Sequence, residues 1–460
     1  MMELKGKKVL VVGLGKSGLA AALFLRHRGA QVTVSDVRSA EALAKELPAL
    51  LDEGIMAEAG GHGLLTFRRQ DLIVVSPGVP LDTPELAQVR SFGLPVIGEL
   101  ELAARFLKGK MLAITGSNGK TTTTALVGEI LEKAGLPTLV GGNIGVPVVG
   151  LIESSTDQTW SVLEVSSFQL ESTEQFHPAI AVILNITPDH LDRHGNFENY
   201  AAAKERIFAA QDASDCLVLN ADNPAAAAAA ARSAARVYLF STAHPVPQGA
   251  WVEDGLLVYR SAPEAAIQKI MPISGIPLKG EHNVQNVLAA VCASLLAGAP
   301  AAKVRLAIES FHAVEHRLEF VAAINGVEFY NDSKATNVDA TEKAIAAFKS
   351  GIHLILGGKD KGAPYTPLAP LIKERVRVIY TIGAAAAKIE SQLRGVVPIL
   401  PCETLEKAVA AAAEAARPGE VVLLAPACSS YDQFESYEHR GRVFKELVTE
   451  HRGWKPCPKE

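Results

Sequence analysis

The chain has 460 residues, 48% of them hydrophobic and 21% charged, and a formal net charge of −5. At roughly 150 residues per domain this length allows about three domains, and the absence of a basic excess argues against nucleic acid as a partner. Five cysteines without a Cys-x-x-Cys pair argue against a disulfide framework or a zinc site. We find no secretory signal and no apolar run long enough to cross a bilayer, so we expect a cytoplasmic protein without membrane insertion.

The first segment has the pattern of a dinucleotide-binding unit. A strand at residues 8–12 leads into Gly13-Leu14-Gly15-Lys16-Ser17-Gly18, a helix at residues 19–28 and a second strand at residues 31–35 that ends at Asp36. Glycines after a strand and an acid at the end of the next strand predict a pyrophosphate- or ribose-bearing ligand. The open alternative is a Rossmann-like unit that binds nothing. Strands at residues 72–76 and 95–98 complete this domain.

A glycine-rich turn follows the apolar strand at residues 111–114. It contains Gly116, Gly119, Lys120 and Thr121, and a helix comes directly after it. Backbone N–H groups, a helix N-terminus, a lysine and a threonine hydroxyl are the parts of a triphosphate–magnesium site. The spacing Gly-x-x-Gly-Lys-Thr is shorter than the usual phosphate-loop motif. The alternative is a strand–turn–helix junction with an incidental lysine.

Polar side chains follow the next buried strands. Glu164 lies near the expected exposed end of a strand at residues 160–165, and Asp189 and His190 follow a strand at residues 180–184. Such strand ends usually form a site, so Glu164 is a candidate magnesium ligand. A buried acid with a local partner, and a structural histidine, remain the alternatives. By pattern alone Lys204 is a solvated helix lysine.

The last third of the chain repeats the alternation of strands and helices. Strands are expected at residues 327–330, 353–356, 378–382 and 421–424, each followed by a polar loop. Asp332 and Lys334 in the first of these loops could hold a ribose and a phosphate, or could form a solvated turn. The fold class is α/β, with a Rossmann-like domain at residues 1–98, a central P-loop ATPase-type domain at 99–313 and a Rossmann-like domain at 314–460.

Several of these motifs resemble the Mur ligase family. The run at residues 114–122, Gly142-Asn143, Glu164, Asp189-His190, the alanine-flanked Lys204, Glu315-His316-Arg317 and the run at residues 331–337 carry the resemblance, which covers essentially the whole chain. It implies an ATP-dependent ligase that joins D-glutamate to UDP-N-acetylmuramoyl-L-alanine through an acyl phosphate, in peptidoglycan precursor synthesis. It further implies small-molecule substrates, two Mg²⁺ sites and a monomeric enzyme.

The resemblance also implies residue roles. The ATP site would comprise Gly116, Ser117, Asn118, Gly119, Lys120, Thr121, Thr122, Asn286, Arg317 and Asp332. The Mg²⁺ ligands would be Thr121, Glu164, His190 and Lys204, with Lys204 carbamylated. The UDP-substrate site would comprise Gly15, Lys16, Ser17, Asp36, Val37, Arg38, Ser76, Pro77, Gly78 and Asn143. D-Glutamate would be held by Lys334, Thr336, Lys361, Ser430 and Tyr437. The residues closest to the reaction would be Lys120, His190, Lys204 and Lys334.

Three other functions remain open at this point. An enzyme similar to folylpolyglutamate synthetase would also have the phosphate loop, but it would begin near that loop and would lack the Gly13–Gly18 domain. An NAD-dependent oxidoreductase with an extra domain would explain the first fingerprint. A nucleotide-binding regulator would explain both phosphate sites without catalysis.

Overall fold

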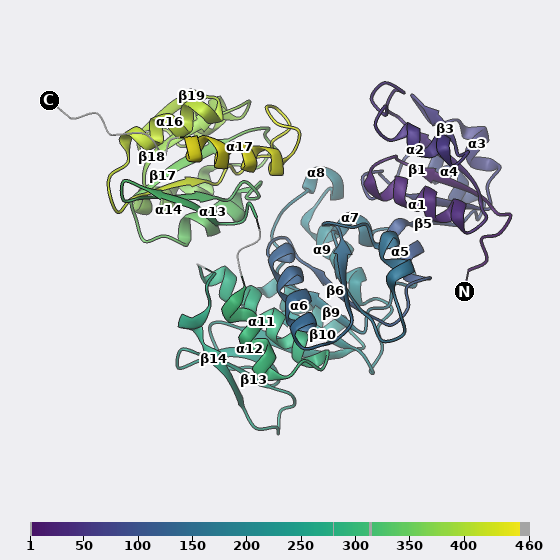
Figure 1. The fold of residues 1–460 in the computed structure, drawn as a ribbon, viewed down its shortest axis with the longest axis horizontal. Helices are drawn as coiled ribbons and strands as arrows, with labels where there is room; N and C mark the ends of the chain where they lie inside the picture. The colour runs from purple at the N-terminus through teal and green to yellow at the C-terminus, as the bar shows by residue number, and fades with distance from the viewer. Residues whose placement is uncertain (1, 279, 312–314, 451–460) are drawn as a thin grey trace. The chain divides into compact units, whose positions relative to one another are not determined.

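The computed structural model describes residues 2–278, 280–311 and 315–450; expectations placed on residue 314 and on residues 451–460 lie outside this range. Within this range the chain forms three β-sheets whose strands alternate with helices (Figure 1), which confirms the expected α/β fold class. Its contacts divide into two compact units, one of Met1–Gly275 with Gln285–Phe311 and one of Ile276–Val284 with His312–Glu460. The first two expected domains therefore share a unit, and each unit is described by itself.

The first sheet is parallel, with the order β3-β2-β1-β4-β5. Its strands are β1 (Lys8–Val12), β2 (Gln31–Asp36), β3 (Met56–Ala59), β4 (Leu72–Val75) and β5 (Val96–Gly98). The helices are α1 (Lys16–His27), α2 (Leu47–Asp52), α3 (Leu64–Arg68), α4 (Pro84–Ser91) and α5 (Glu99–Ala104). Val9 and Val11 pack in one hydrophobic cluster and Leu10 and Val12 in another, so both faces of the sheet are covered.

Helix α1 begins earlier than the sequence pattern suggests. It starts at Lys16 rather than at residue 19, so Gly18 lies inside its first turn. A Cβ atom on Gly18 would lie 1.9 Å from the carbonyl oxygen of Gly13. The glycine therefore allows the close approach of helix and strand on which this fingerprint depends.

The second sheet has nine strands in the order β14-β13-β12-β11-β10-β9-β6-β8-β7. They are β6 (Lys110–Thr115), β7 (Thr138–Gly142), β8 (Trp160–Glu164), β9 (Ile180–Ile183), β10 (Cys216–Asn220), β11 (Arg236–Ser241), β12 (Gly249–Glu253), β13 (Leu256–Arg260) and β14 (Gln268–Pro272). All pairs are parallel except β12–β13 and β13–β14, which are antiparallel.

Helices and short 3-10 segments connect these strands. They are α6 (Lys120–Lys133), η1 (Val148–Ser154), α7 (Ser167–Leu170), α8 (Leu191–His194), α9 (Phe197–Glu205), η2 (Arg206–Phe208), α10 (Pro224–Ala227), η3 (Ala228–Arg232), η4 (Ile273–Gly275), α11 (Glu281–Leu296) and α12 (Ala301–Ser310). Residues 225–231 are all alanine, which favours helix, and they are split between α10 and η3.

The third sheet has the order β15-β16-β20-β17-β18-β19 and is parallel except for the β15–β16 hairpin. Its strands are β15 (Glu319–Ile324), β16 (Val327–Asn331), β17 (Ile352–Gly357), β18 (Val376–Ile382), β19 (Ile399–Glu403) and β20 (Val421–Leu424). The helices are α13 (Val338–Ala346), η5 (Thr366–Leu368), α14 (Ala369–Arg375), α15 (Ala386–Gln392), α16 (Leu405–Ala415) and α17 (Tyr437–Glu450). Two hydrophobic clusters cover its two faces.

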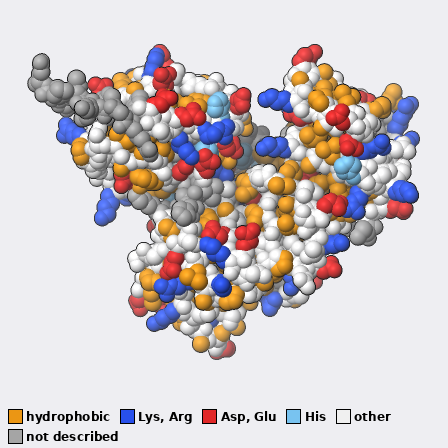
Figure 2. All heavy atoms as spheres, viewed as in Figure 1, with side chains coloured by type: hydrophobic (Ala, Val, Ile, Leu, Met, Phe, Trp, Pro, Cys, Tyr) orange, Lys and Arg blue, Asp and Glu red, His pale blue; other side chains and the backbone are white. Residues whose placement is uncertain are grey.

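The surface carries charges of both signs. On the face drawn in Figure 2, blue Lys and Arg side chains alternate with red Asp and Glu side chains, and no continuous basic area is visible. Among the described residues, no helix is both long and apolar enough to cross a membrane.

Candidate active site

The strand order of the second sheet reverses at β6, and polar residues gather at the strand ends there. Strand β6 lies between β8 and β9, with Ile114 opposite Glu164 and Thr115 opposite Ile183. The chain leaves β6 into the loop that carries Lys120. Because ligands bind outside the carboxyl ends of parallel strands where the strand order reverses, this edge of the sheet is the candidate active site.

Two glycines shape the loop after β6. Gly116 and Gly119 have φ angles of 157° and 88°, which L-amino acids with side chains rarely adopt. A Cβ atom on Gly119 would lie 2.2 Å from Oδ1 of Asn286, which belongs to α11. The structure thus places Asn286 directly against the loop, although it lies far away in the sequence.

Side chains from neighbouring elements hold the loop in shape. The amide group of Asn185 accepts from the backbone N–H of Asn118 at 2.8 Å and donates to its carbonyl oxygen at 3.0 Å. Oγ of Ser117 lies 2.9 Å from the hydroxyl of Tyr200 and 2.9 Å from the carbonyl oxygen of Thr187. The loop is therefore preorganised by buried groups.

Lys120 and Lys204 converge on this loop. Each ammonium group donates to the carbonyl oxygen of Gly116 at 2.8 Å. Lys204 is only 1% exposed and lies over the ring of Tyr200, so its interpretation as a solvated lysine is wrong. Burial and then the charge of Lys120 lower the pKa of Lys204 well below its usual range, against smaller opposing effects of nearby carboxylates.

Glu164 faces the same edge of the sheet and is buried, with 1% exposure. Its Oε1 accepts a hydrogen bond from the side-chain amide of Asn143 at 2.8 Å. Its Oε2 is buried and has no hydrogen-bond partner among the described atoms. Burying a carboxylate oxygen costs free energy unless a cation or a hydrogen-bond donor lies beside it. This carboxylate therefore fits a Mg²⁺ ligand.

His190, Thr121 and Thr122 complete this region. His190 has a left-handed backbone, with φ of 52°, and its ring lies edge-on to Phe168 at 4.9 Å. Thr121 and Thr122 occupy the first turn of α6 and are buried. The structure therefore brings the implied metal ligands to one edge of the second sheet.

The carboxyl end of the first sheet carries a second group of polar residues. Asp36 accepts from the backbone N–H of Leu14 at 2.7 Å and from that of Arg38 at 2.8 Å, and it pairs with the Arg38 guanidinium. Burial opposes ionisation of Asp36, but these hydrogen bonds prevail and lower its pKa to about 2. Ser76 donates to the carbonyl oxygen of Gly13 at 2.6 Å, which ties the loops after β1 and β4 together.

The remaining residues implied for the UDP-substrate site are more exposed. Val37 is 67% exposed, and its apolar side chain offers a ligand no hydrogen bond. The other members of the implied set are partly or fully exposed; they are Gly15, Lys16, Ser17, Pro77 and Gly78.

The second compact unit has its own group of polar strand ends. Asp332, directly after β16, is buried and accepts from the backbone N–H of Leu318 at 3.2 Å. Burial raises the pKa of Asp332 to about 6, although the positive charges of Arg317 and Lys334 oppose this. The Nε atom of Arg317 is buried without a hydrogen-bond partner among the described atoms. Asp332 and Arg317 therefore lie together, and Asp332 is not a solvated turn residue.

The residues implied for D-glutamate lie on adjoining loops of this unit. The ammonium of Lys334 lies 5.3 Å from the ring centre of Tyr437, and that of Lys361 lies 3.4 Å from Oγ1 of Thr336. Ser430 is buried in the loop after β20. Two lysines, two hydroxyls and an aromatic ring suit a small dianionic ligand.

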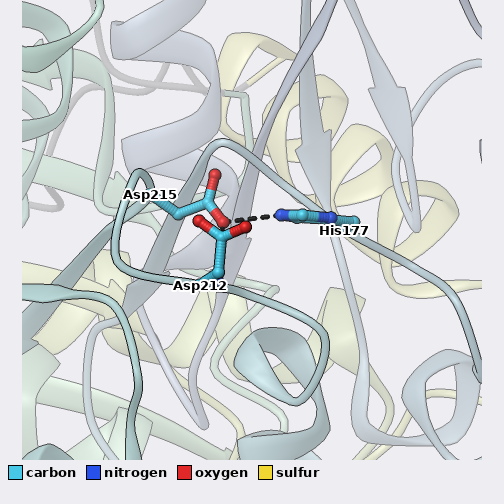
Figure 3. Close-up of side chains that lie close together, drawn as sticks. All are labelled: His177, Asp212 and Asp215. Carbon is cyan, nitrogen blue, oxygen red and sulfur yellow. Dashed lines mark hydrogen bonds and ion pairs between the residues drawn. The ribbon is translucent and has the colours of Figure 1, made fainter.

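A further cluster lies elsewhere on the second sheet (Figure 3). The Nε2 atom of His177 is 2.6 Å from Asp215, whose carboxylate also accepts from the backbone N–H of Asp212 at 2.8 Å. These residues precede β9 and β10, so they lie at the edge opposite the phosphate loop. The cluster braces two loops and takes no part in the candidate site.

Sequence reasoning assigned no individual role to Asn185 or Tyr200. A signal for Tyr200 was its position four residues before Lys204 on one helix, which places both on the same helix face. Asn185 follows β9 closely, at the strand end where ligand-binding groups collect.

Comparisons with known proteins give matches over all three sheets. Residues 7–98 match the N-terminal domain of MurD-like Mur ligases, residues 114–294 the Mur ligase middle domain and residues 316–428 the glutamate ligase domain of Mur ligases. The UDP-N-acetylmuramoylalanine–D-glutamate ligase of Acidobacterium capsulatum is 70% identical over 452 residues, 98% of each chain. That of Koribacter versatilis is 59% identical over 447 residues, 97% of this chain and 98% of its own.

Solved structures agree on the fold. The UDP-N-acetylmuramate–alanine ligase MurC of Thermotoga maritima aligns with a TM-score of 0.61 at 21% identity, over 96% of this chain and 99% of its own. The MurF ligase of Thermotoga maritima, solved in complex with ADP, aligns with a TM-score of 0.61 at 15% identity, over 98% of this chain and 100% of its own.

Proposed function

The chain belongs to the Mur ligase family, and from this we propose that it is an ATP-dependent ligase that adds D-glutamate to UDP-N-acetylmuramoyl-L-alanine in peptidoglycan precursor synthesis. The two relatives described above carry the name of this activity at 70% and 59% identity over nearly the whole chain. The observation that carries the proposal is the convergence of Lys120, Lys204 and the unpartnered oxygen of Glu164 at the end of β6.

The phosphate loop and Glu164 would bind ATP with Mg²⁺. The backbone N–H groups of residues 116–121 and the N-terminus of α6 suit a triphosphate. Thr121, Glu164 and His190 would supply metal ligands; the buried, unpartnered Oε2 of Glu164 supports this, because Mg²⁺ takes carboxylate oxygens. When bound, the metal neutralises phosphate charge and polarises the γ-phosphoryl group.

Lys204 would contribute as a carbamate. Burial and the charge of Lys120 lower the pKa of Lys204, which favours the neutral, nucleophilic amine over the ammonium. Addition of CO₂ to the neutral amine nitrogen forms the carbamate and releases one proton, which turns the amine into an anionic oxygen ligand. That change suits a magnesium site, since an ammonium would repel the metal.

The reaction would proceed in two displacements. The L-alanine carboxylate attacks the γ-phosphorus of ATP, which forms an acyl phosphate and releases ADP. The amine of D-glutamate then attacks the acyl carbon, an amide bond forms, and phosphate leaves as the amine loses its proton. The protein would act mainly by positioning and charge stabilisation, with Lys120 near the phosphates and Lys334 near the incoming amino acid.

The remaining residues would bind the ends of the substrates. We assign the uridine diphosphate end to the strand ends that carry Asp36, Arg38 and Ser76, together with Asn143. Asn286, Arg317 and Asp332 would contact the adenine nucleotide. The carboxylates of D-glutamate would be held by Lys334, Thr336, Lys361 and Ser430, with Tyr437 beside them. Domain limits of 1–98, 99–313 and 314–460 and a monomeric state belong to the same proposal.

Phosphate release tests this function. We expect release from ATP only when UDP-N-acetylmuramoyl-L-alanine and D-glutamate are both present, with L-glutamate and other D-amino acids as controls. A product with a new amide bond, identified by mass spectrometry, should accumulate in equal amount. Tight NAD binding without phosphate release under any condition would instead favour the oxidoreductase, and ATP binding without turnover would favour a regulator.

A further inference from the structure

Arg440 is a fully buried arginine in the second compact unit, on α17, with an exposure of 0%. Its Nε donates to Oγ of Ser333 at 2.9 Å, and its Nη2 donates to the carbonyl oxygen of Ser333 at 2.8 Å. Nη2 also donates to the carbonyl oxygen of Cys428 at 3.2 Å, and Nη1 to that of Ser429 at 3.4 Å. Every acceptor in these four bonds is neutral, which is unusual for a buried cation.

These acceptors belong to loops that follow different strands. Ser333 lies in the loop after β16, and Cys428 and Ser429 lie in the loop after β20. The loop after β17 packs on the same group, because a Cβ atom on Gly358 would lie 3.1 Å from Nη1 of Arg440. Lys359 and Ser429 exchange backbone hydrogen bonds at 2.9 and 3.2 Å, which joins the second and third loops directly.

The same loops carry the residues assigned to D-glutamate. Lys334 and Thr336 follow Ser333, Lys361 follows Gly358, and Ser430 follows Ser429. Tyr437 stands one helical turn before Arg440 on α17, and its carbonyl oxygen accepts from Oγ of Ser333 at 2.8 Å. One guanidinium therefore connects every segment that would contact the amino acid.

Arg440 does not itself face a ligand, since its side chain is buried and directed at backbone oxygens. From this geometry we propose that Arg440 is a positioning residue that sets the spacing of Lys334, Lys361 and Ser430 and so determines the affinity for the incoming amino acid. The inference rests on the proposed ligase function. A lysine could not replace Arg440 fully, because one ammonium cannot reproduce the planar guanidinium that donates to several acceptors at once.

The test is steady-state kinetics of Arg440→Met, Arg440→Lys and Ser333→Ala. We expect the KM for D-glutamate to rise about tenfold or more in Arg440→Met, less in Arg440→Lys and least in Ser333→Ala, which loses one of the four contacts. The KM values for ATP and for the UDP-linked substrate should stay within about twofold.

A matched control separates positioning from stability. His353 is a buried polar residue at the other end of β17, bonded to Tyr380 at 2.9 Å and to Glu420 at 3.1 Å. His353→Leu should lower the melting temperature without changing the KM for D-glutamate.

Two results would overturn the inference. One is a D-glutamate KM that stays unchanged in Ser333→Ala and in each folded Arg440 variant while only the melting temperature falls; the other is an equal rise of all three KM values. If Arg440→Met does not fold, the D-glutamate KM values of Arg440→Lys and Ser333→Ala decide. Absence of D-glutamate-dependent phosphate release in the parent enzyme would refute the proposed function instead.

Discussion

Lys120 and Lys204 donate to one and the same acceptor, the carbonyl oxygen of Gly116, each at 2.8 Å. Two ammonium groups at one neutral oxygen repel each other. Of the two lysines, Lys204 is buried, whereas Lys120 is partly exposed. The repulsion and the burial both favour the neutral form of Lys204. This relationship links the phosphate loop to the reactivity of a lysine on α9.

Replacing Lys204 tests that link. We expect Lys204→Ala to lower kcat by roughly 10²–10³-fold, the size typical for loss of a group that stabilises transition-state charge. Bicarbonate or a short carboxylate should restore part of the activity, because it would replace the missing anionic ligand. Lys108→Ala, an exposed lysine in the same unit, is the control and should keep full activity. Full activity in Lys204→Ala would show that the residue has only a packing role.

Gly119 is the position where the phosphate loop tolerates a side chain least. Gly119→Ala would place Cβ 2.2 Å from Oδ1 of Asn286 in addition to the strain of a φ of 88°. We expect at least about tenfold weaker binding of a fluorescent ATP analogue, equivalent to about 1.4 kcal/mol.

Gly135→Ala is the matched control for Gly119→Ala. Gly135 follows the same helix and has a similar φ of 79°, but a Cβ atom there would meet no atom within 4 Å. This variant should lose about 1 kcal/mol of stability and keep its ATP affinity. Equal ATP affinity in the two variants would mean that the contact with Asn286 does not shape the nucleotide site.

Glu164 should determine the magnesium requirement. Glu164→Gln keeps the size of the side chain and the acceptor for Asn143, but it removes the charge of a carboxylate whose second oxygen is unpartnered. We expect kcat to fall by roughly 10²–10³-fold and the Mg²⁺ concentration for half-maximal rate to rise. Glu132→Gln, an exposed glutamate on α6, should change neither quantity. An unchanged Mg²⁺ titration in Glu164→Gln would exclude Glu164 as a ligand.

Glu99 should make stability depend on pH. It is fully buried at the start of α5; burial raises its pKa from 4.5 to about 7, against hydrogen bonds from the N–H groups of Val149 and Val148. The folded protein then binds this proton more tightly than the unfolded chain, so the contribution of Glu99 is present below pH 4.5 and is lost as pH rises toward 7.

Glu99→Gln imitates the protonated acid and removes this dependence. The stability of the parent relative to the variant should therefore fall by a few kcal/mol, at about 1.4 kcal/mol per pKa unit, between pH 4.5 and pH 8. Urea unfolding of both proteins at the two pH values measures the difference, because every other titrating group is common to them. A constant difference would contradict the raised pKa.

Much of the fold follows from local pattern. Apolar runs with glycines or polar residues at their ends correctly predicted most strands to within one or two residues, because buried parallel strands must be apolar and must end where the chain turns. The helix after β1 was misplaced because Gly18 has no side chain and so gives no signal of the helix turn that contains it. The exposure of Lys204 was also wrongly predicted from pattern, because burial depends on segments that pack from elsewhere.

The sequence by itself determined the chemical groups of this protein and the family to which it belongs. Lys120, Glu164 and Asp332 are polar groups that follow or end apolar strands, and such placement depends only on local residue order. Only the tertiary structure decided which of these groups meet. Asn286 reaches Gly119, Lys204 shares an acceptor with Lys120, and Arg440 joins three loops, because parallel strands bring distant segments to one sheet edge. The lowered pKa of Lys204 has the same origin, since desolvation is a property of packing.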